Sequence, residues 1–298
     1  MDVSAAHKKV WTILDLINWG TSYLTDKGFD EARLNIELLT SHVLHLPRIQ
    51  LYTNFDRPLN DDELALFKDL FKRRLMHEPI QYIIGATEFM GFPYLVNSHV
   101  LIPRPETEIL VEHVVERIQQ KSKSGEGVRM LDIGTGSGCI AVSIAKMLPH
   151  VEIVAIDISR DALAMAQENA ARNGVEQRVE FSLLDVSSID ENTFLKRFNV
   201  IVSNPPYIST AEYDRLPEEV KNYEPSIALI AETDGLKYYR FIAHQGGCVL
   251  DHNGFIAVEH GYDQSARVNE ILSNEGYGSI TQIKDYAGHD RCLIAERE

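Results

Sequence analysis

The spacing of hydrophobic residues changes near residue 79. Before that point apolar side chains recur every three or four positions, which is typical of amphipathic helices. Asn60 followed by Glu63 matches a helix-capping pattern. The helix that follows should end before Pro79, and one of its faces carries Leu64, Phe67, Phe71 and Leu75. The pattern therefore predicts a small helical domain over residues 1–78.

Residues 79–101 have a different pattern. Two short β-type runs, at 81–84 and 92–96, are separated by glycines, which predicts a β-hairpin that links two domains. The segment that follows, 101–108, contains two prolines. Because a proline disfavours helix in the residue before it, we expect an extended lead into a helix that begins near Thr107.

Strand and helix patterns alternate from residue 128 onward. Predicted strands lie at 128–133, 152–157, 179–184, 198–204 and 254–260, and predicted helices at 139–148, 160–173, 235–248 and 264–275. Two closing strands, 279–286 and 290–297, should form an antiparallel hairpin. Such alternation is typical of parallel strands covered by helices on both faces. The sequence therefore predicts an α/β fold with a Rossmann-like, mostly parallel sheet over residues 102–298.

The net charge of the 298-residue chain is −15, and it is unevenly distributed. Residues 1–85 hold 10 Lys and Arg against 12 Asp and Glu, whereas residues 86–298 hold 19 against 32, a net charge of −13. Binding to a phosphate backbone normally depends on clustered Lys and Arg. We therefore predict that the chain has no direct nucleic-acid partner.

Neither a membrane segment nor a metal motif is evident in the sequence. No apolar run approaches the roughly 18 residues of a membrane-spanning helix, and the N-terminus lacks a secretory pattern. We therefore predict a cytoplasmic protein with no membrane partner, and a monomer by default. The cysteines are far apart with no Cys-x-x-Cys pair, which argues against a disulfide framework or a zinc site: Cys139, Cys248 and Cys292.

A glycine-rich turn follows the first predicted strand of the sheet. Ligands in open α/β sheets bind outside the carboxyl ends of the strands, and glycines there let the backbone approach a cofactor. The turn therefore predicts a cofactor loop formed by Gly134, Thr135, Gly136, Ser137 and Gly138.

Acidic residues follow the next two predicted strands. Asp157 is placed to accept hydrogen bonds from both hydroxyls of a ribose, although taken alone it is equally well explained as a helix cap. Asp185 is placed near an adenine edge. A dinucleotide fingerprint counted from Gly134 would need glycine at the position of Cys139. S-adenosyl-L-methionine contains no pyrophosphate, so its binding does not require a glycine at that position. We therefore predict it as the cofactor.

The run Asn204, Pro205, Pro206 and Tyr207 ends the fourth predicted strand at a stiff polar corner. An amide nitrogen is a weak nucleophile because its lone pair is delocalised into the carbonyl group. If the Asn204 side-chain oxygen and the Pro205 carbonyl oxygen each accept one N–H of a carboxamide, the nitrogen faces the cofactor. Tyr207 would stack on the amide plane. We predict that positioning and electrostatics, without a histidine base, carry the transfer.

The chain resembles the release-factor glutamine methyltransferases of the PrmC/HemK type. The likeness covers nearly the whole sequence and includes the helical front domain and residues 78–85, 89–91, 101–108, 132–138 and 204–207. It implies transfer of a methyl group from S-adenosyl-L-methionine to the side-chain amide nitrogen (N5) of a glutamine. That glutamine lies in the Gly-Gly-Gln motif of peptide chain release factors. The helical domain would bind the release factor.

The resemblance leaves several positions open. Phe89 would either close over the cofactor or fill the domain junction. Arg104 would either pair with a glutamate of its own segment or contact a ligand. The loop 187–197 is longer than the usual connection, and it leaves Val186 as the candidate residue on the adenine face.

Two other functions fit parts of the sequence. Adenine N6-methyltransferases also carry the Asn-Pro-Pro-Tyr run, but the acidic second domain and the lack of a basic recognition segment oppose this alternative. A non-catalytic protein that senses S-adenosyl-L-methionine would keep its output after the substitution Asn204→Ala, whereas an enzyme would lose turnover.

Overall fold

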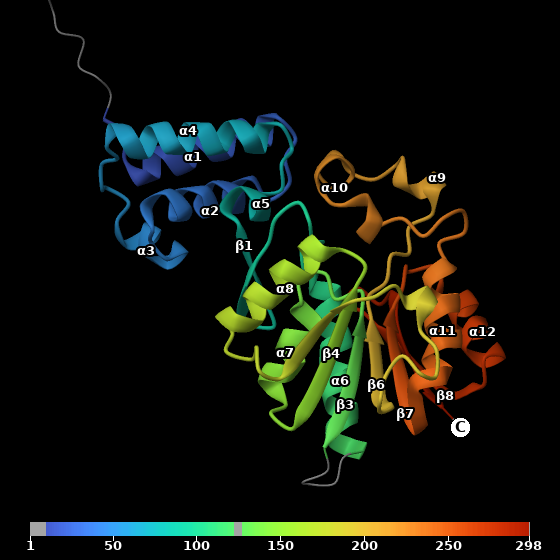
Figure 1. The fold of residues 1–298 in the computed structure, drawn as a ribbon. Helices are drawn as coiled ribbons and strands as arrows, with labels where there is room; N and C mark the ends of the chain where they lie inside the picture. Colours follow the sequence, from blue (N-terminus) through green and yellow to red (C-terminus); the bar gives the residue numbers. More distant parts are fainter. Residues whose placement is uncertain (1–9, 122–126, 298) are drawn as a thin grey trace, which may run out of the picture. The chain divides into compact units, whose positions relative to one another are not determined.

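The computed structural model describes residues 10–121 and 127–297, and it divides between Ile84 and Gly85 into two units (Figure 1). Each unit has hydrophobic core clusters made only of its own residues. The division lies within the segment 79–101 that the sequence analysis assigned to the linker.

The first unit is helical, with a core that includes Ile17, Ile36 and Phe67. Capping boxes at Thr12 and Asn60 begin its first and fourth helices, as the Asn60 pattern predicts. The fourth helix ends at Leu75, before Pro79. The helices are α1 (Ile13–Asp26), α2 (Ala32–Leu44), α3 (Arg48–Thr53), α4 (Asp61–Leu75) and α5 (Ile80–Ile84).

Residues 81–84 belong to helix α5, so the predicted first strand of the hairpin is wrong. Ile80 and Ile83 are three residues apart and both enter the core of the first unit, which requires helical spacing. The Pro79 carbonyl accepts hydrogen bonds from the amides of Tyr82 and Ile83, as in a helical turn. A hairpin does follow, displaced along the chain: β1 (Ala86–Phe89) pairs antiparallel with β2 (Phe92–Leu95).

The second unit contains a seven-stranded sheet in the order β5-β4-β3-β6-β7-β9-β8. The pairs from β5 to β7 are parallel, and β9 runs antiparallel to both of its neighbours. This confirms the predicted mostly parallel sheet with an antiparallel final hairpin. The strands are β3 (Val128–Ile133), β4 (Val151–Asp157), β5 (Val179–Leu183), β6 (Phe198–Ser203), β7 (Leu250–Glu259), β8 (Tyr277–Lys284) and β9 (Asp290–Arg297).

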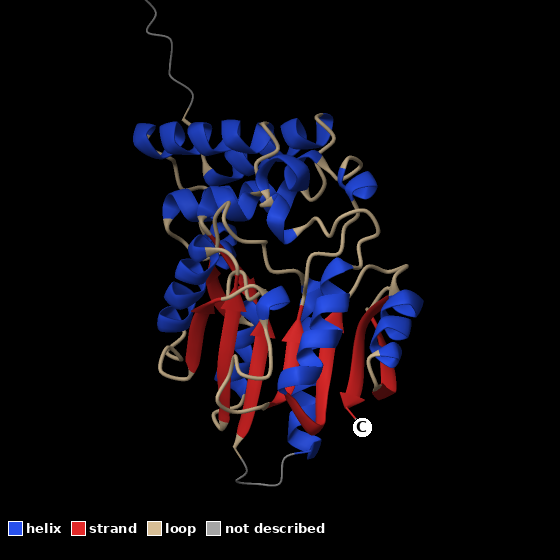
Figure 2. Ribbon diagram, turned by 45° about the vertical axis from the view of Figure 1, so that its right-hand side comes forward, coloured by secondary structure: helices blue, strands red, loops and turns tan. Residues whose placement is uncertain are grey.

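Helices cover both faces of this sheet (Figure 2). Successive residues of β6 point to opposite faces: Val200 and Val202 join the core beside α6 and α7, whereas Ile201 joins the core beside α11 and α12. The principal helices are α6 (Pro105–Lys121), α7 (Cys139–Met147), α8 (Arg160–Arg172), α11 (Lys237–Val249) and α12 (Ser265–Asn274).

Short helices that the sequence analysis did not predict follow β5 and β6. They are η1 (Val186–Ser188), α9 (Thr210–Tyr213), α10 (Glu218–Tyr223) and η2 (Ser226–Ala228). Each has six residues or fewer, too short for a periodic pattern to stand out. None of the helices among the described residues has both the length and the apolar character that crossing a membrane requires.

Candidate active site

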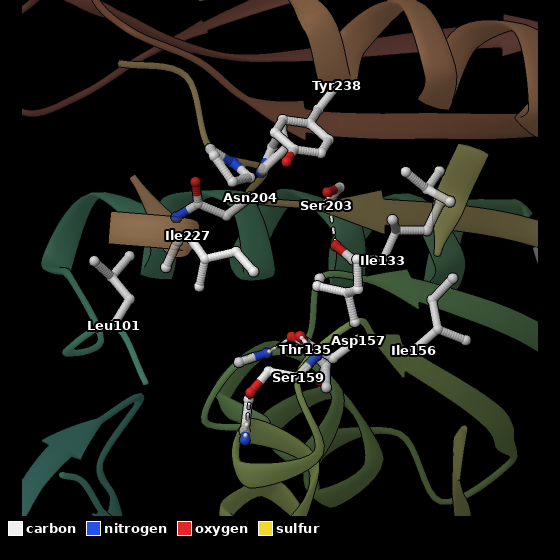
Figure 3. A pocket seen from close by; sticks show the side chains of 18 of the residues that line it. Leu101, Ile133, Thr135, Ile156, Asp157, Ser159, Ser203, Asn204, Ile227 and Tyr238 are labelled. Atoms are coloured by element: carbon white, nitrogen blue, oxygen red, sulfur yellow. Dashed lines mark hydrogen bonds between the residues drawn. The ribbon is translucent and has the colours of Figure 1, made fainter. Parts of the chain in front are cut away.

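A pocket of about 320 Å³ lies at the carboxyl ends of β3, β4 and β6. Here β4 and β6 flank β3 on opposite sides, which is the switch point where open α/β sheets bind ligands. Figure 3 shows Asn204 and Tyr238 on one side of the pocket and Thr135 and Asp157 on the other. Apolar side chains from several elements complete its wall: Leu101, Ile133, Ile140, Ile156, Ile227 and Phe241.

The glycine loop contributes four of its five predicted residues to the pocket, namely Gly134, Thr135, Gly136 and Ser137. Gly138 is not part of the lining. Its φ is +80°, and a Cβ there would lie 3.0 Å from the Cβ of Ala166. Gly138 therefore allows α7 and α8 to pack closely, and its contact with the cofactor stays a prediction.

Asp157 lies at the pocket with both carboxylate oxygens held by backbone amides. Its Oδ2 accepts from the Gly136 amide and its Oδ1 from the Ser159 amide, each at 2.9 Å. Ser159, not Asp157, caps helix α8. Burial raises the pKa of Asp157. Each oxygen keeps further acceptor capacity, so the carboxylate can both shape the glycine loop and accept hydrogen bonds from a ligand.

Asp185 and Val186 line the same pocket after β5. Asp185 Oδ1 accepts a hydrogen bond from the Ser187 amide at 2.8 Å and so begins η1. This turn brings the Val186 side chain, which is 7% exposed, to the pocket wall. An apolar side chain beside a carboxylate suits a flat ring with polar edges.

The polar corner brings Asn204, Pro205 and Pro206 to the pocket. Asn204 Nδ2 donates to Thr107 Oγ1 at 3.0 Å, and the Thr107 hydroxyl donates to Glu259 Oε2 at 2.6 Å. Among the residues that the structure describes, no group donates to Asn204 Oδ1 or to the Pro205 carbonyl oxygen. Two acceptors that can receive the hydrogens of a carboxamide therefore remain available at the corner.

Tyr207 is not among the residues that line the pocket, and its stacking on a substrate amide stays a prediction. Its ring packs against the core cluster beside α11 and α12. Gln264 Nε2 donates to the Tyr207 carbonyl oxygen at 2.8 Å and so fixes the backbone after the corner. Aromatic rings that do line the pocket come from α11, and Figure 3 shows that of Tyr238.

Phe89 is also not among the residues that line the pocket, and its contact with the cofactor stays a prediction. It is 1% exposed and lies in the core beside α6 and α7, with its ring 6.0 Å from that of Tyr94. The Asn169 side chain holds the hairpin to α8 by bonding to both the amide and the carbonyl of Leu95. The hairpin is thereby fixed against the sheet unit, and Phe89 fills its core.

Arg104 lines the pocket and pairs with Glu224 instead of a glutamate of its own segment. Glu224 is 5% exposed and also accepts a hydrogen bond from the Ile102 amide at 3.3 Å. Burial raises the pKa of Glu224, and the Arg104 guanidinium opposes that shift. The pair joins segment 101–107 to the chain around Ile227, and both stretches line the pocket.

Three polar residues of this region were not predicted individually: Thr107, Asp132 and Glu259. Thr135 donates to one oxygen of Asp132 at 2.7 Å, and the other oxygen has no partner among the described residues. Burial raises the pKa of Asp132 and the pKa of Glu259, each to about 7. Glu259 ends β7, so the rule that selected Asp157, a carboxylate at a strand end, would also have found it.

The residues present fit S-adenosyl-L-methionine. A Cβ at Gly134 would meet no heavy atom within 4 Å, so that part of the loop is open toward a ligand. Asp157 offers acceptors for ribose hydroxyls, and Asp185 with Val186 offers an edge and a face for adenine. Asn204 lies across the pocket, where the transferred group would be received (Figure 3).

Comparison with known proteins gives matches over both units. Residues 15–85 match the family described as PrmC N-terminal domain, and residues 124–285 match the one described as methyltransferase domain. Among solved structures, the hMettl16 catalytic domain in complex with MAT2A 3′UTR hairpin 1 superposes with a TM-score of 0.55. It is 17% identical, with 79% of this chain and 80% of that chain covered. This likeness supports the methyltransferase fold alone.

Curated relatives are similar over nearly the full length. A release factor glutamine methyltransferase of Geobacter sulfurreducens is 43% identical over 285 residues, which cover 96% of each chain. One of Chlorobaculum tepidum is 40% identical over 288 residues, which cover 96% of this chain and 97% of that one. The chain therefore belongs to the family of release factor glutamine methyltransferases, and it is an S-adenosyl-L-methionine-dependent methyltransferase.

Proposed function

We propose that this enzyme methylates the side-chain amide nitrogen (N5) of the glutamine in the Gly-Gly-Gln motif of peptide chain release factors. Family membership supports a release factor as the protein substrate. The observation that carries the proposal is the corner at Asn204, where a side-chain oxygen and a neighbouring carbonyl oxygen are both available at the pocket.

The corner suits a group with two N–H hydrogens on one nitrogen. Asn204 Oδ1 would accept one hydrogen of the glutamine amide, and the Pro205 carbonyl oxygen would accept the other. With both hydrogens held, rotation of the amide is restricted, and the nitrogen lone pair is directed away from the two acceptors. A hydroxyl group has one hydrogen to offer, and a carboxylate has none, so both are selected against.

S-adenosyl-L-methionine, when bound, supplies an electrophilic methyl group. Asp157, Asp185 and the glycine loop would hold the adenosine part, and Asn204 and Pro205 would hold the acceptor amide. The two hydrogen bonds from the amide hold its NH₂ group in one orientation and stabilise the positive charge that develops on the nitrogen as the methyl group is transferred. The remaining contribution is orientation of the reacting atoms. No side-chain base is required before transfer, because the methylated nitrogen is acidic and loses its proton to water.

Methyl-labelled cofactor incubated with a release factor tests this proposal. We expect label on protein, and fragmentation by mass spectrometry should assign it to the glutamine of the Gly-Gly-Gln motif. A release factor with that glutamine replaced by Glu is the matched control and should stay unlabelled. Label on added RNA or DNA, with none on glutamine, would instead support the adenine N6-methyltransferase alternative.

A further inference from the structure

We propose that Thr107 and Glu259 are positioning residues that orient the Asn204 side chain so that its oxygen, not its nitrogen, faces the substrate. The inference rests on the proposed function for its kinetic consequences. The orientation itself is a property of the unliganded protein and can be tested without any substrate.

The direction of the hydrogen bonds determines which end of the amide is presented. The Thr107 hydroxyl has one hydrogen, and it is donated to Glu259 Oε2 at 2.6 Å. Thr107 Oγ1 then has only lone pairs to offer to Asn204. The Asn204 nitrogen can donate to them, as it does at 3.0 Å, whereas its oxygen would face another acceptor. An ionised Glu259 therefore sets the orientation of Asn204 through Thr107.

Burial makes this arrangement selective. Thr107 is 2% exposed and Glu259 is 1% exposed, so water cannot easily replace either partner. The three residues come from different elements: Thr107 from the first turn of α6, Glu259 from the end of β7 and Asn204 from the residue after β6. A buried polar group without a partner is costly, so the reversed amide is disfavoured as long as Glu259 is charged.

Protonation of Glu259 would remove this control. A neutral carboxyl group can donate to Thr107 Oγ1, which frees the threonine hydrogen to bond either to Asn204 or elsewhere. Both orientations of the amide then find partners. Burial raises the pKa of Glu259 to about 7. Arg104 and Arg291 favour the charged form and Glu106 opposes it, and the other titratable groups near Glu259 are Cys139, Tyr207, Tyr239 and Cys292.

The first test replaces the Thr107 hydroxyl by a methyl group, which keeps the shape of the side chain. Thr107→Val should lower kcat by about 10- to 100-fold, because the acceptor amide is no longer held in place. Binding of S-adenosylhomocysteine by calorimetry should change little. Thr107→Ser should recover most of the rate. Ser143→Ala is the control, since it removes a buried hydroxyl of the same unit that bonds to Tyr94, away from the pocket.

A double substitution shows whether Thr107 acts through Asn204. Adding Thr107→Val to Asn204→Ala should cause no further loss, because the group being oriented is already absent. A multiplicative loss in the double variant, a normal rate for Thr107→Val, or a Thr107→Ser enzyme as slow as Thr107→Val would each overturn the proposal.

The second test concerns the charge of Glu259. In the wild-type enzyme kcat/KM should rise as pH increases through about 7, where Glu259 ionises. Glu259→Gln should be slower and should lose this limb of the profile. Glu296, on the neighbouring strand β9, pairs with Arg117 and Lys121 and serves as the control. The variant Glu296→Gln should keep the pH dependence of the wild type. Retention of the limb in Glu259→Gln would contradict the role of Glu259.

Nuclear magnetic resonance measures the orientation without catalysis. The side-chain NH₂ signals of Asn204, assigned by their loss in Asn204→Asp, should include one slowly exchanging hydrogen in wild type. Thr107→Val should abolish that protection. Equal exchange in the two proteins would overturn the orientation claim. If protection is lost as expected but no glutamine is methylated, the proposed function fails and the positioning role of Thr107 stands.

Discussion

Among single residues, Asn204 is the one on which the proposed reaction depends most, through its side-chain oxygen. Asn204→Ala should lower kcat by about 10²- to 10³-fold, the usual effect of removing one preorganised hydrogen-bonding group. Affinity for S-adenosylhomocysteine should be retained, because the cofactor side of the pocket is unchanged. Steady-state kinetics and calorimetry measure the two quantities. A kcat for Asn204→Ala close to that of the wild type would contradict the role of the side-chain oxygen as a hydrogen-bond acceptor.

Asn204→Asp should retain more activity than Asn204→Ala, since an oxygen acceptor remains. Its new carboxylate would face Thr107 Oγ1, whose hydrogen is already donated to Glu259. Two carboxylates sharing one hydrogen favour uptake of a proton. The residual rate of this variant should therefore rise as pH falls from 8 to 6, opposite to the wild-type trend. Equal activity of the Asp and Ala variants at every pH would contradict this prediction.

At the scale of elements, helix α11 contains two adjacent glycines in different surroundings. A Cβ at Gly247 would be 3.8 Å from the nearest atom, whereas a Cβ at Gly246 would lie 3.0 Å from Ile256 Cδ1 and 3.2 Å from Ile201 Cδ1. Gly247→Ala should raise the free energy of unfolding by about 0.5–1 kcal/mol through helix propensity. Gly246→Ala should raise the free energy of unfolding by less, or lower it, because the added methyl group would crowd Ile256 and Ile201. Urea unfolding compares them, and equal gains would contradict the packing described.

The ion pair between Arg104 and Glu224 joins two stretches that line the pocket. Glu224→Ala should weaken binding of S-adenosylhomocysteine by about 10-fold, since the half-buried Arg104 would lose its partner and the two stretches would no longer be joined. Stopped-flow measurements should attribute the change to faster dissociation. Glu152→Ala on β4, which removes an exposed carboxylate paired with Arg129 of β3, is the control and should bind normally. Unchanged dissociation in Glu224→Ala would show that the pair does not retain the ligand.

Three of the parallel strands, β4, β5 and β6, could be predicted from the sequence because each is closely followed or ended by a residue with a distinct preference. Asp157, Asp185 and Pro205 follow apolar runs whose lengths fit strands. Where two periodicities compete in a short run, prediction fails: residues 81–84 are apolar enough for a strand, but the spacing of Ile80 and Ile83 matches the core of the helical unit.

Among the predicted site residues, the groups attached to strand ends line the pocket, whereas two aromatic rings do not. Asn204, Pro205 and Asp157 are placed by the backbone they terminate, and they line the pocket. The direction of a large ring depends on packing that the sequence does not reveal. Phe89 and Tyr207 therefore turn into cores, while Tyr238, which no motif marks, lines the pocket.

For the molecule as a whole, the buried carboxylates should make stability depend on pH. Burial raises the pKa of Asp132 to about 7, well above its value in an unfolded chain. Its contribution to stability is therefore complete below about pH 4 and is lost as pH rises through 7. In the wild type the thermal unfolding midpoint (Tm) should fall between pH 5.5 and 8, and Asp132→Asn should make that fall smaller. Asp161→Asn, a substitution at an exposed position, is the control. An unchanged pH dependence in Asp132→Asn would contradict the raised pKa.

A structure of the enzyme with S-adenosylhomocysteine and a glutamine peptide of a release factor tests the central claim most directly. The glutamine side-chain nitrogen should lie within hydrogen-bonding distance of both Asn204 Oδ1 and the Pro205 carbonyl oxygen, and it should face the sulfur atom. The hydrogen bond from Asn204 Nδ2 to Thr107 should persist. A glutamine bound with its oxygen toward the corner, or outside the pocket, would contradict the account.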